Sequence, residues 1–240
     1  ATCDSSAKEK GVMPLPGAGF DVVPTDCLAL YLKNLLPDAT NLILAFYSNG
    51  KPSHGTMLTA LESLGKGGRI RVDGKILTVP PAYKKMKIDF GEGPKMAVTI
   101  PWGDVSTAYY TTGIPNIEVY MAVTPGMNIL LKGVKLSQSI IGSNLLQNTL
   151  KNFVPEGGPS AEEREKNYSL VWGKVENSSG DHKEARLKTP DGYTLTSKTS
   201  VLIASKVLND QFKPGFQTPA GAYGCDLVLE VHGVERISVS

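Results

Sequence analysis

The chain is poor in the residues that most often bind metals or carry out covalent catalysis. It contains three histidines and three cysteines among 240 residues. Cys3, Cys27 and Cys225 lie far apart, at no spacing typical of a metal site, and an odd number of cysteines provides no disulfide framework. This pattern argues against a disulfide-stabilised secreted domain and predicts no metal site. It favours a reducing compartment, for which we expect the cytoplasm.

Long apolar runs and an excess of charge are also missing. No run of about 18 apolar residues occurs, so the sequence predicts no transmembrane helix. Neither a signal peptide nor a transit peptide is visible. Charged residues make up 20% of the chain and the formal net charge is +2, a balance that gives no reason to expect nucleic acid or an anionic membrane surface as a partner. The length suffices for one domain with a full core.

The apolar pattern predicts several hairpins interspersed with helices. Asp73-Gly74 is typical of a type I′ turn and predicts one hairpin, and Ser178-Ser179-Gly180 marks a second. We expect strands at 11–15, 41–47, 69–72, 75–79, 85–90, 96–100, 117–123, 168–176, 183–187 and 225–231. Helices are expected at 24–36, 53–64, 127–153 and 196–208, with a short one capped by Asp104 and a charged loop at 157–167. Hairpins plus helices in one chain predict an α+β domain with a mixed, largely antiparallel sheet covered by helices.

The segment Pro16–Asp26 has the most informative local pattern. It reads Pro-Gly-Ala-Gly-Phe-Asp-Val-Val-Pro-Thr-Asp and stands between a short apolar run and a helical pattern, so it predicts a strand, a glycine-rich turn and a helix. Gly17 and Gly19 allow a tight turn and a close approach to a ligand, and Pro24 suits the first turn of a helix. The alternative is an ordinary strand-to-helix connection, because the third glycine of a dinucleotide fingerprint is missing.

Other polar and aromatic residues have two interpretations each. Trp102, Asp104 and Tyr109 follow a predicted strand, where an aromatic patch is a common pocket wall, although helix capping also explains Asp104. His54 follows the predicted N-cap Ser53 and either faces substrate or is structural. Asp26 is expected to cap a helix, and the role of Asp21 stays open between capping and lining a cleft. No Ser-His-Asp or Cys-His pairing is visible, so the catalytic residues are unknown.

Four blocks of the sequence resemble saccharopine dehydrogenase-like oxidoreductases. The first, Gly17–Cys27, is similar to the signature Gly-x-Gly-Phe-Asp-x-x-Pro-x-Asp of that family. The other three blocks follow in the family's order and, with the first, cover most of the chain. They are Gly55–Arg71 with Gly67-Gly68, Ile88–Tyr120 with the run Ile100–Tyr109, and Thr189–Glu230 with Gly192-Tyr193 and Gly215–Pro219.

The resemblance implies a sheet with its helices on one face, together with remnants of a Rossmann domain. The family's amino-terminal Gly-x-x-Gly-x-x-Gly turn is not found, so we expect a carboxyl-terminal portion of a larger protein. Its expected parts are the tail of the dinucleotide domain (1–36), the substrate-binding and dimerisation domain (37–210) and a return segment (211–240). Gly17, Gly19, Phe20 and Asp21 would then lie beside the nicotinamide of NAD or NADP in the complete protein, whereas this chain alone would bind little or no cofactor.

The resemblance does not identify the substrate, but the positions of the arginines restrict its chemical class. Saccharopine carries several carboxylates, which call for arginines, yet none stands in the glycine-rich segment or near Trp102. We therefore expect a small molecule other than saccharopine, such as the apolar substrates of the related trans-acting enoyl reductases. A homodimer built on residues 127–153 or on a sheet edge is also expected. The alternative function is a non-catalytic binding module that retains the fold.

Overall fold

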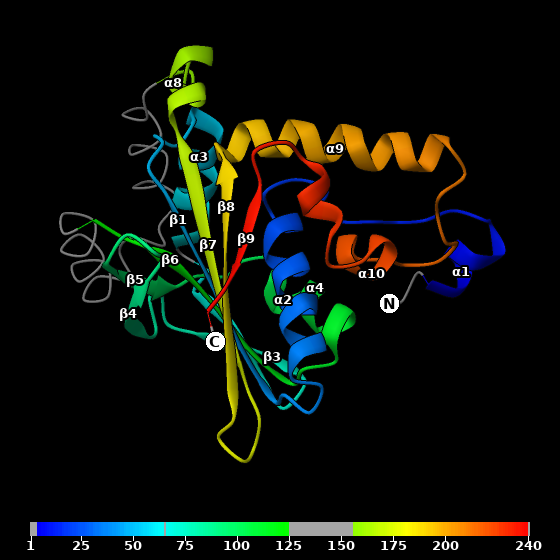
Figure 1. Cartoon of the computed structure of the whole chain (residues 1–240), viewed down its shortest axis with the longest axis horizontal. Coiled ribbons are helices and arrows are strands. Elements are labelled where there is room, and N and C mark those ends of the chain that lie inside the picture. Colours follow the sequence, from blue (N-terminus) through cyan, green and yellow to red (C-terminus); the bar gives the residue numbers. More distant parts are fainter. Residues whose placement is uncertain (1–3, 65, 125–155, 240) are drawn as a thin grey trace.

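The computed structural model of the chain describes residues 4–64, 66–124 and 156–239, and these form a nine-stranded mixed sheet with helices packed against it (Figure 1). The strand order is β3-β2-β6-β1-β7-β8-β9, and β5 joins the hairpin of β4 and β5 to β6. Strands β1 and β6 run parallel, and every other pairing between described strands is antiparallel. The strands are β1 (Asn41–Ser48), β2 (Gly68–Val72), β3 (Lys75–Val79), β4 (Lys85–Asp89), β5 (Pro94–Thr99), β6 (Asn116–Ala122), β7 (Tyr168–Glu176), β8 (His182–Pro190) and β9 (Glu235–Ser238).

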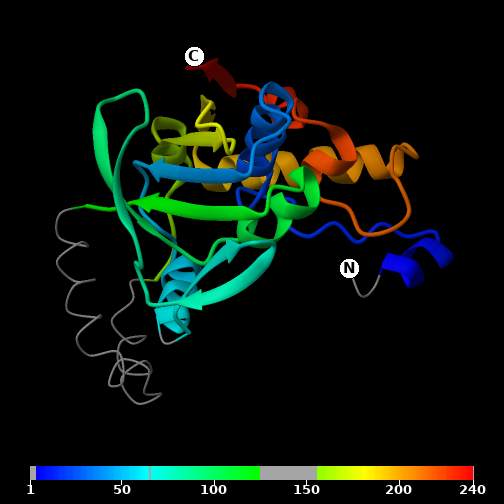
Figure 2. The same cartoon turned by 90° about the horizontal axis from the view of Figure 1, so that it is seen from below.

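Helices α2 and α4 cover one face of this sheet, α10 packs on these two helices, and the long helix α9 runs across the end of the sheet (Figure 1). Figure 2 shows the hairpin of β4 and β5 standing out to one side of the sheet, with α1 apart from the sheet at the opposite end of the molecule. The predicted α+β class with a mostly antiparallel sheet is confirmed. The helices are α1 (Asp4–Glu9), α2 (Val23–Leu35), α3 (His54–Leu64), α4 (Asp104–Thr112), α8 (Ala161–Lys166), α9 (Gly192–Leu208) and α10 (Pro219–Tyr223), with a 3-10 turn η1 (Leu227–Glu230).

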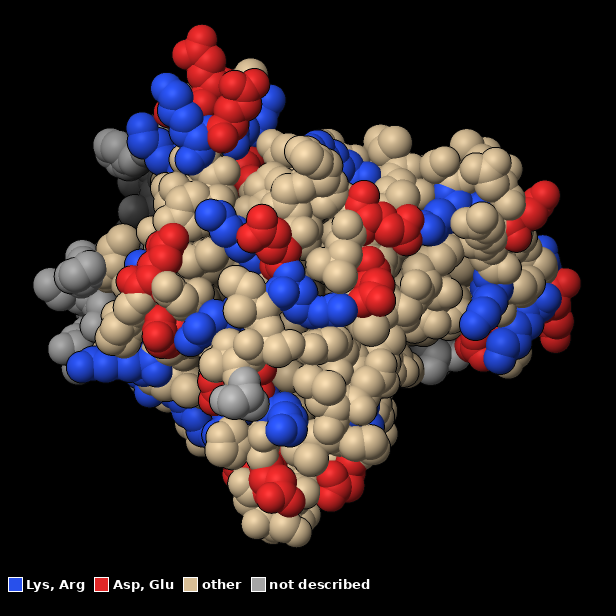
Figure 3. Space-filling view, in the orientation of Figure 1, with Lys and Arg blue, Asp and Glu red and all other residues tan. Residues whose placement is uncertain are grey.

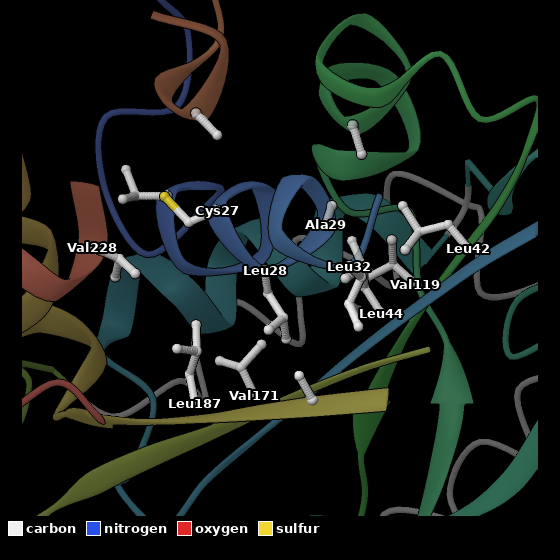
Figure 4. Packing of buried hydrophobic residues seen from close by; sticks show 14 of the residues in the cluster. Cys27, Leu28, Ala29, Leu32, Leu42, Leu44, Val119, Val171, Leu187 and Val228 are labelled. Carbon is white, nitrogen blue, oxygen red and sulfur yellow. The ribbon is translucent and has the colours of Figure 1, made fainter. Parts of the chain in front are cut away.

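The main core lies between α2 and the sheet. Figure 4 shows Leu28 and Leu32 of α2 directed at the strands below them, and both side chains are fully buried. Burying a leucine side chain contributes about 1.5–3 kcal/mol. The helix lies close to the sheet because β7 has a glycine beneath it: a Cβ atom on Gly173 would be 2.7 Å from Leu32 Cδ1 and 3.1 Å from Leu28 Cδ2. Thus one core unites α2 with the sheet. The division of the chain at residue 36 stays a prediction.

Local turn chemistry explains both predicted hairpins. Asp73 and Gly74 both have positive φ, 47° and 75°, as a type I′ turn between β2 and β3 requires. Between β7 and β8, the Asn177 side-chain oxygen accepts hydrogen bonds from the backbone N–H groups of Ser179 and Asp181. The Asn177 amide also donates to Asp38 at 2.9 Å, which ties this loop to the segment before β1.

Four predicted elements were wrong or displaced. Residues 11–15 form no strand, although the carbonyls of Val12 and Pro14 accept hydrogen bonds from Gly215 and Gln217. The loop expected at 157–167 contains α8, which begins with a capping box between Ser160 and Glu163. The strand expected at 225–231 is the turn η1, and the last strand is β9.

Helix α9 starts at Gly192, one turn earlier than predicted, because the Asp191 carboxylate caps the N–H groups of Tyr193 and Thr194. The helix predicted at 127–153 lies outside the described residues. Within the described part of the chain, no helix combines the length and the apolar character that crossing a membrane requires.

Candidate functional site

The glycine-rich turn leads into α2 and is held against the first turns of α9. Gly17 has a φ of +78°, and a Cβ atom there would lie 2.7 Å from Val22 Cγ2. A Cβ atom on Gly19 would lie 2.7 Å from Thr196 Cγ2 of α9, and the N–H of Phe20 donates to Thr196 Oγ1 at 3.0 Å. Both glycines are therefore required by close contacts within the chain itself.

Three aromatic rings meet beside this turn. The half-buried Phe20 packs edge-on against Phe46 of β1, with ring centroids 5.4 Å apart and an interplanar angle of 87°. Trp102 also packs against Phe46, with ring centroids 4.7 Å apart. The indole Nε1 of Trp102 is buried and has no hydrogen-bond partner within the described residues. The fold thus brings the glycine-rich turn and the Trp102 block together.

A carboxylate joins the same two segments. The backbone N–H of Gly103, at the start of α4, donates a hydrogen bond to the Asp21 side chain. Gly103 has room for no side chain, since a Cβ atom there would be 2.6 Å from Asp21 Oδ1 and 2.7 Å from Val22 Cγ1. Burial raises the pKa of the Asp21 carboxyl, and the hydrogen bond from Gly103 acts in the opposite direction.

Asp104 does not cap α4, contrary to the prediction. Gly103 is the N-cap residue, and no side chain caps the helix. The Asp104 carboxyl is fully buried, with Oδ2 2.7 Å from Thr25 Oγ1 of α2 and Oδ1 without a hydrogen-bond partner. Burial raises the pKa of this carboxyl well above its usual range, and the nearby charge of Asp26 raises it further. A direct contact between Asp104 and substrate stays a prediction.

Asp26 does not cap its own helix either. Its buried carboxylate accepts hydrogen bonds from the Thr111 hydroxyl of α4 and, at 2.8 Å, from the N–H of Ala220 in α10. The N-cap position of α2 is Val22, which makes no side-chain cap. Asp26 therefore links three helices in space. The positions of the acidic residues near a predicted helix start could not indicate this link between helices.

Tyr109 and His54 lie apart from the aromatic cluster in chain position and in their described contacts. The Tyr109 ring, in the middle of α4, stacks on the Arg71 guanidinium, whose Cζ lies 4.2 Å from the ring centroid. His54 begins α3, where its N–H donates to Gly157 O at 2.8 Å. The neighbouring Ser53 N–H donates to the Tyr193 hydroxyl at 2.6 Å. Substrate contacts for Tyr109 and His54 stay predictions.

Sequence reasoning missed two residues that build the cluster. Phe46 was hidden in an apolar strand, although strand alternation places it on the same face as Leu42 and Leu44. Thr196 carried no signal, because only the packing of α9 brings it against Gly19.

Two of the hollows on the described part of the chain lie away from the aromatic cluster. One, of about 310 Å³, is lined by Asp4, Lys8, Tyr110, Phe216 and Gln217. The other, of about 540 Å³, lies between α9 and residues 230–232. Neither is lined by Phe20, Asp21 or Trp102.

Positive and negative side chains are interspersed on the molecular face shown in Figure 3. That face therefore carries no broad field of one sign. Among the described residues, no group of three or more potential metal-binding side chains gathers in one place.

Comparisons with known proteins agree with this architecture at the level of fold. Neither a protein-family model nor the sequence of a curated protein matches the chain. Among solved structures, the chain is similar to apo histidine-tagged saccharopine dehydrogenase (L-Glu forming) from Saccharomyces cerevisiae. The TM-score is 0.60 at 10% sequence identity, and the match covers 100% of this chain and 77% of that chain. The chain therefore shares its fold with a saccharopine dehydrogenase.

Proposed function

We propose that this chain is the substrate-binding and dimerisation portion of an NAD(P)-dependent oxidoreductase. The observation that carries the proposal is the meeting of the glycine-rich turn with the Trp102 block, in a chain with the fold of a saccharopine dehydrogenase. Sequence blocks far apart in the chain converge on one small area, as the parts of a binding site do.

The residues at this area fit the nicotinamide end of a dinucleotide and not its pyrophosphate. Phe20 and Trp102 offer aromatic surface and a buried N–H without a partner. Gly17 and Gly19, in contrast, are occupied by contacts with Val22 and Thr196, so they leave no cradle for phosphate. When bound, the cofactor supplies the hydride. The residues of this chain orient the substrate and exclude water.

The site at Phe20 and Trp102 is proposed to be shared with a second domain. A nucleotide-binding domain placed against the glycine-rich turn would cover these rings and complete the pocket. The turn is already attached to the main core through α2, so covering it needs no rearrangement of the sheet.

The substrate is proposed to be apolar and not a polycarboxylate. All five arginines lie in described segments and have partners away from the Phe20–Trp102 cluster. Arg71 donates to the carbonyls of Val105 and Gly74, Arg69 to those of Lys66 and Gly68, and Arg164 to that of Pro159. Arg186 pairs with Asp89, and Arg236 pairs with Asp226. A substrate with several carboxylates would find no free guanidinium there.

The proposed dimer forms at the β3 edge of the sheet. Ile76 and Leu77 of this strand, the outermost in the described sheet, are 47% and 43% exposed, and exposed apolar residues on a sheet edge favour pairing with another chain. Leu77→Lys should shift the mass measured by light scattering from dimer to monomer. The control Val201→Lys alters another exposed apolar residue, on α9, and should leave the mass unchanged.

Cofactor binding tests the main proposal. Calorimetric titration with NADH and NADPH should show micromolar binding to the complete gene product and little or none to the 240-residue chain. Oxidation of the bound nicotinamide should proceed with apolar α,β-unsaturated carbonyl compounds and not with 2-oxoglutarate plus lysine. Failure of the complete product to bind either nucleotide would favour a non-catalytic binding module. A Gly-x-x-Gly-x-x-Gly turn encoded upstream of Ala1 would favour the oxidoreductase.

A further inference from the structure

Two buried carboxyl groups, on different helices, hold the helix layer together. Asp26 of α2 and Asp104 of α4 are both completely inaccessible to solvent. A buried ionised carboxylate is costly unless several donors surround it, so the donors around each acid indicate which of the two carries the charge.

Asp26 has the surroundings of an anion. One of its oxygens accepts from the Thr111 hydroxyl and the other from the N–H of Ala220, so both have a donor. Thr111 in turn shares a hydrogen bond with Thr218, whose hydroxyl accepts from the N–H of Gly221 at the start of α10. The chain of hydrogen bonds from Gly221 through the two threonines ends at the Asp26 carboxylate.

Asp104 has the surroundings of a neutral acid. Its only side-chain partner among the described residues is Thr25 Oγ1, at 2.7 Å from Oδ2, while Oδ1 has no partner. The same Thr25 oxygen lies 2.9 Å from the carbonyl oxygen of Val22. A hydroxyl has one proton, which cannot be donated to both oxygens. Both short contacts become hydrogen bonds if Asp104 itself supplies a proton to Thr25, and Thr25 donates its own to Val22.

We propose that Asp104 is held protonated as a hydrogen-bond donor to Thr25 while Asp26 carries the charge, and that this proton fixes the start of α4 against α2. The consequence extends to the aromatic cluster. Asp104 directly follows Gly103, whose N–H binds Asp21, and Trp102 precedes both. Asp104 is thus a positioning residue for the Trp102 block, independent of whether the chain serves an oxidoreductase.

Burial raises the pKa of both carboxyls, but at Asp26 the hydrogen bonds from Thr111, Ala220 and Thr218 act in the opposite direction, and the pKa of Asp104 is raised further. The charged groups facing Asp104 are Asp26 on α2 and Asp21 in the preceding turn, both of the same sign as an ionised Asp104. The Arg71 guanidinium donates to the carbonyl of Val105, the residue after Asp104, and stacks on Tyr109, and it forms no ion pair with Asp104. Burial first, and then these like charges, raise the pKa of Asp104. Since the folded state keeps a proton that the unfolded chain releases, this stabilisation is complete below the ordinary pKa of aspartic acid. It is lost as pH rises through the raised pKa.

Infrared spectroscopy of protein labelled with ¹³C-aspartate tests where the proton lies. At neutral pH we expect a protonated-carboxyl stretch that shifts with the label, disappears in Asp104→Asn and persists in Asp26→Asn. No such band in the wild-type protein would overturn the proposal even if a variant failed to fold. A band lost in Asp26→Asn and retained in Asp104→Asn would also overturn it.

Thermal unfolding provides the matched comparison. An asparagine amide can still donate to Thr25, so Asp104→Asn should change the unfolding midpoint by less than about 3 °C, and Asp26→Asn should lower it by about 5–10 °C. The midpoint of the wild-type protein should fall relative to Asp104→Asn as pH is raised above neutrality. In Trp172→Phe, where Trp102 is the remaining tryptophan, its emission should change over the same pH range. Equal losses in both asparagine variants, or parallel pH profiles, would contradict the proposal.

Discussion

The glycine-rich turn before α2 and the hairpin turn between β2 and β3 use glycine for different reasons. At Gly74 the backbone has a φ of +75°, and the nearest atom to an added Cβ would be Tyr109 Oη at 3.5 Å, an ordinary contact. At Gly19 φ is not positive, yet Thr196 would lie at 2.7 Å from the added atom. Gly74 is therefore needed for its backbone conformation, whereas Gly19 is needed to leave space for α9. Similar glycine signals in a sequence can have unrelated physical causes.

The largest effect is expected at Gly19, where a substitution tests whether the glycine leaves space for α9. Gly19→Val should destabilise the protein by about 3 kcal/mol or more, because the larger side chain must displace Thr196 at the start of α9. Denaturant unfolding measures the loss. Combining Gly19→Ala with Thr196→Ala should recover most of the stability lost in Gly19→Ala alone. An additive double variant would show that the contact with α9 is not the cause.

Phe20 comes next in expected effect. Since the ring is half-buried and packed on Phe46, Phe20→Ala should cost about 2–3 kcal/mol, below the 3–5 kcal/mol of a fully buried phenylalanine. In the complete protein we also expect lower turnover, because the ring would wall the nicotinamide. Thermal midpoint and steady-state kinetics are measured on the same variant. A large fall in midpoint with unchanged activity of the folded fraction would assign Phe20 to the core alone.

The smallest effect is expected at the hairpin. Gly74→Ala should destabilise by about 1 kcal/mol, because the new side chain strains a left-handed backbone but meets no close neighbour. Gly74→Asn should cost less, since asparagine adopts this conformation more readily. Chemical denaturation of the three proteins gives the order directly. A loss at Gly74 as large as that of Gly19→Val would remove the distinction between the two turns.

The sequence predicted those elements whose structure depends only on residues close together in the chain. Asp73-Gly74 fixed a hairpin by turn geometry, and the alternating and continuous apolar runs located most of the strands. The Ser160-x-x-Glu163 capping box was visible as well, but the charged residues that follow it led to the prediction of a loop. Residues 225–231 are apolar enough for a strand, yet packing against α2 gives the 3-10 turn η1.

The candidate site was less predictable because its contacts join distant segments. The resemblance named Phe20 and Trp102, but Phe46, whose ring contacts both, comes from a strand that pattern alone could assign only to the core. Asp26 and Asp104 looked like helix caps because acids at helix starts usually are. Their actual partners, Ala220 and Thr25, lie on other helices, which no local rule could connect with them.

Gly173 places an unusual demand on β7. A glycine in a strand interior weakens the sheet, since it has no side chain to pack and gives the unfolded chain more freedom. Here any side chain would push Leu28 and Leu32 outward and lift α2 from the strands. In a library of substitutions scored for folding, position 173 should tolerate almost no replacement. By β-strand propensity alone, nearly every other residue would be preferred to glycine there. Its partly exposed neighbour Lys174, whose side chain lies on the opposite face, should accept many. The pattern of tolerated substitutions along β7 would thus show where α2 packs on the strand, although α2 lies more than a hundred residues earlier in the chain.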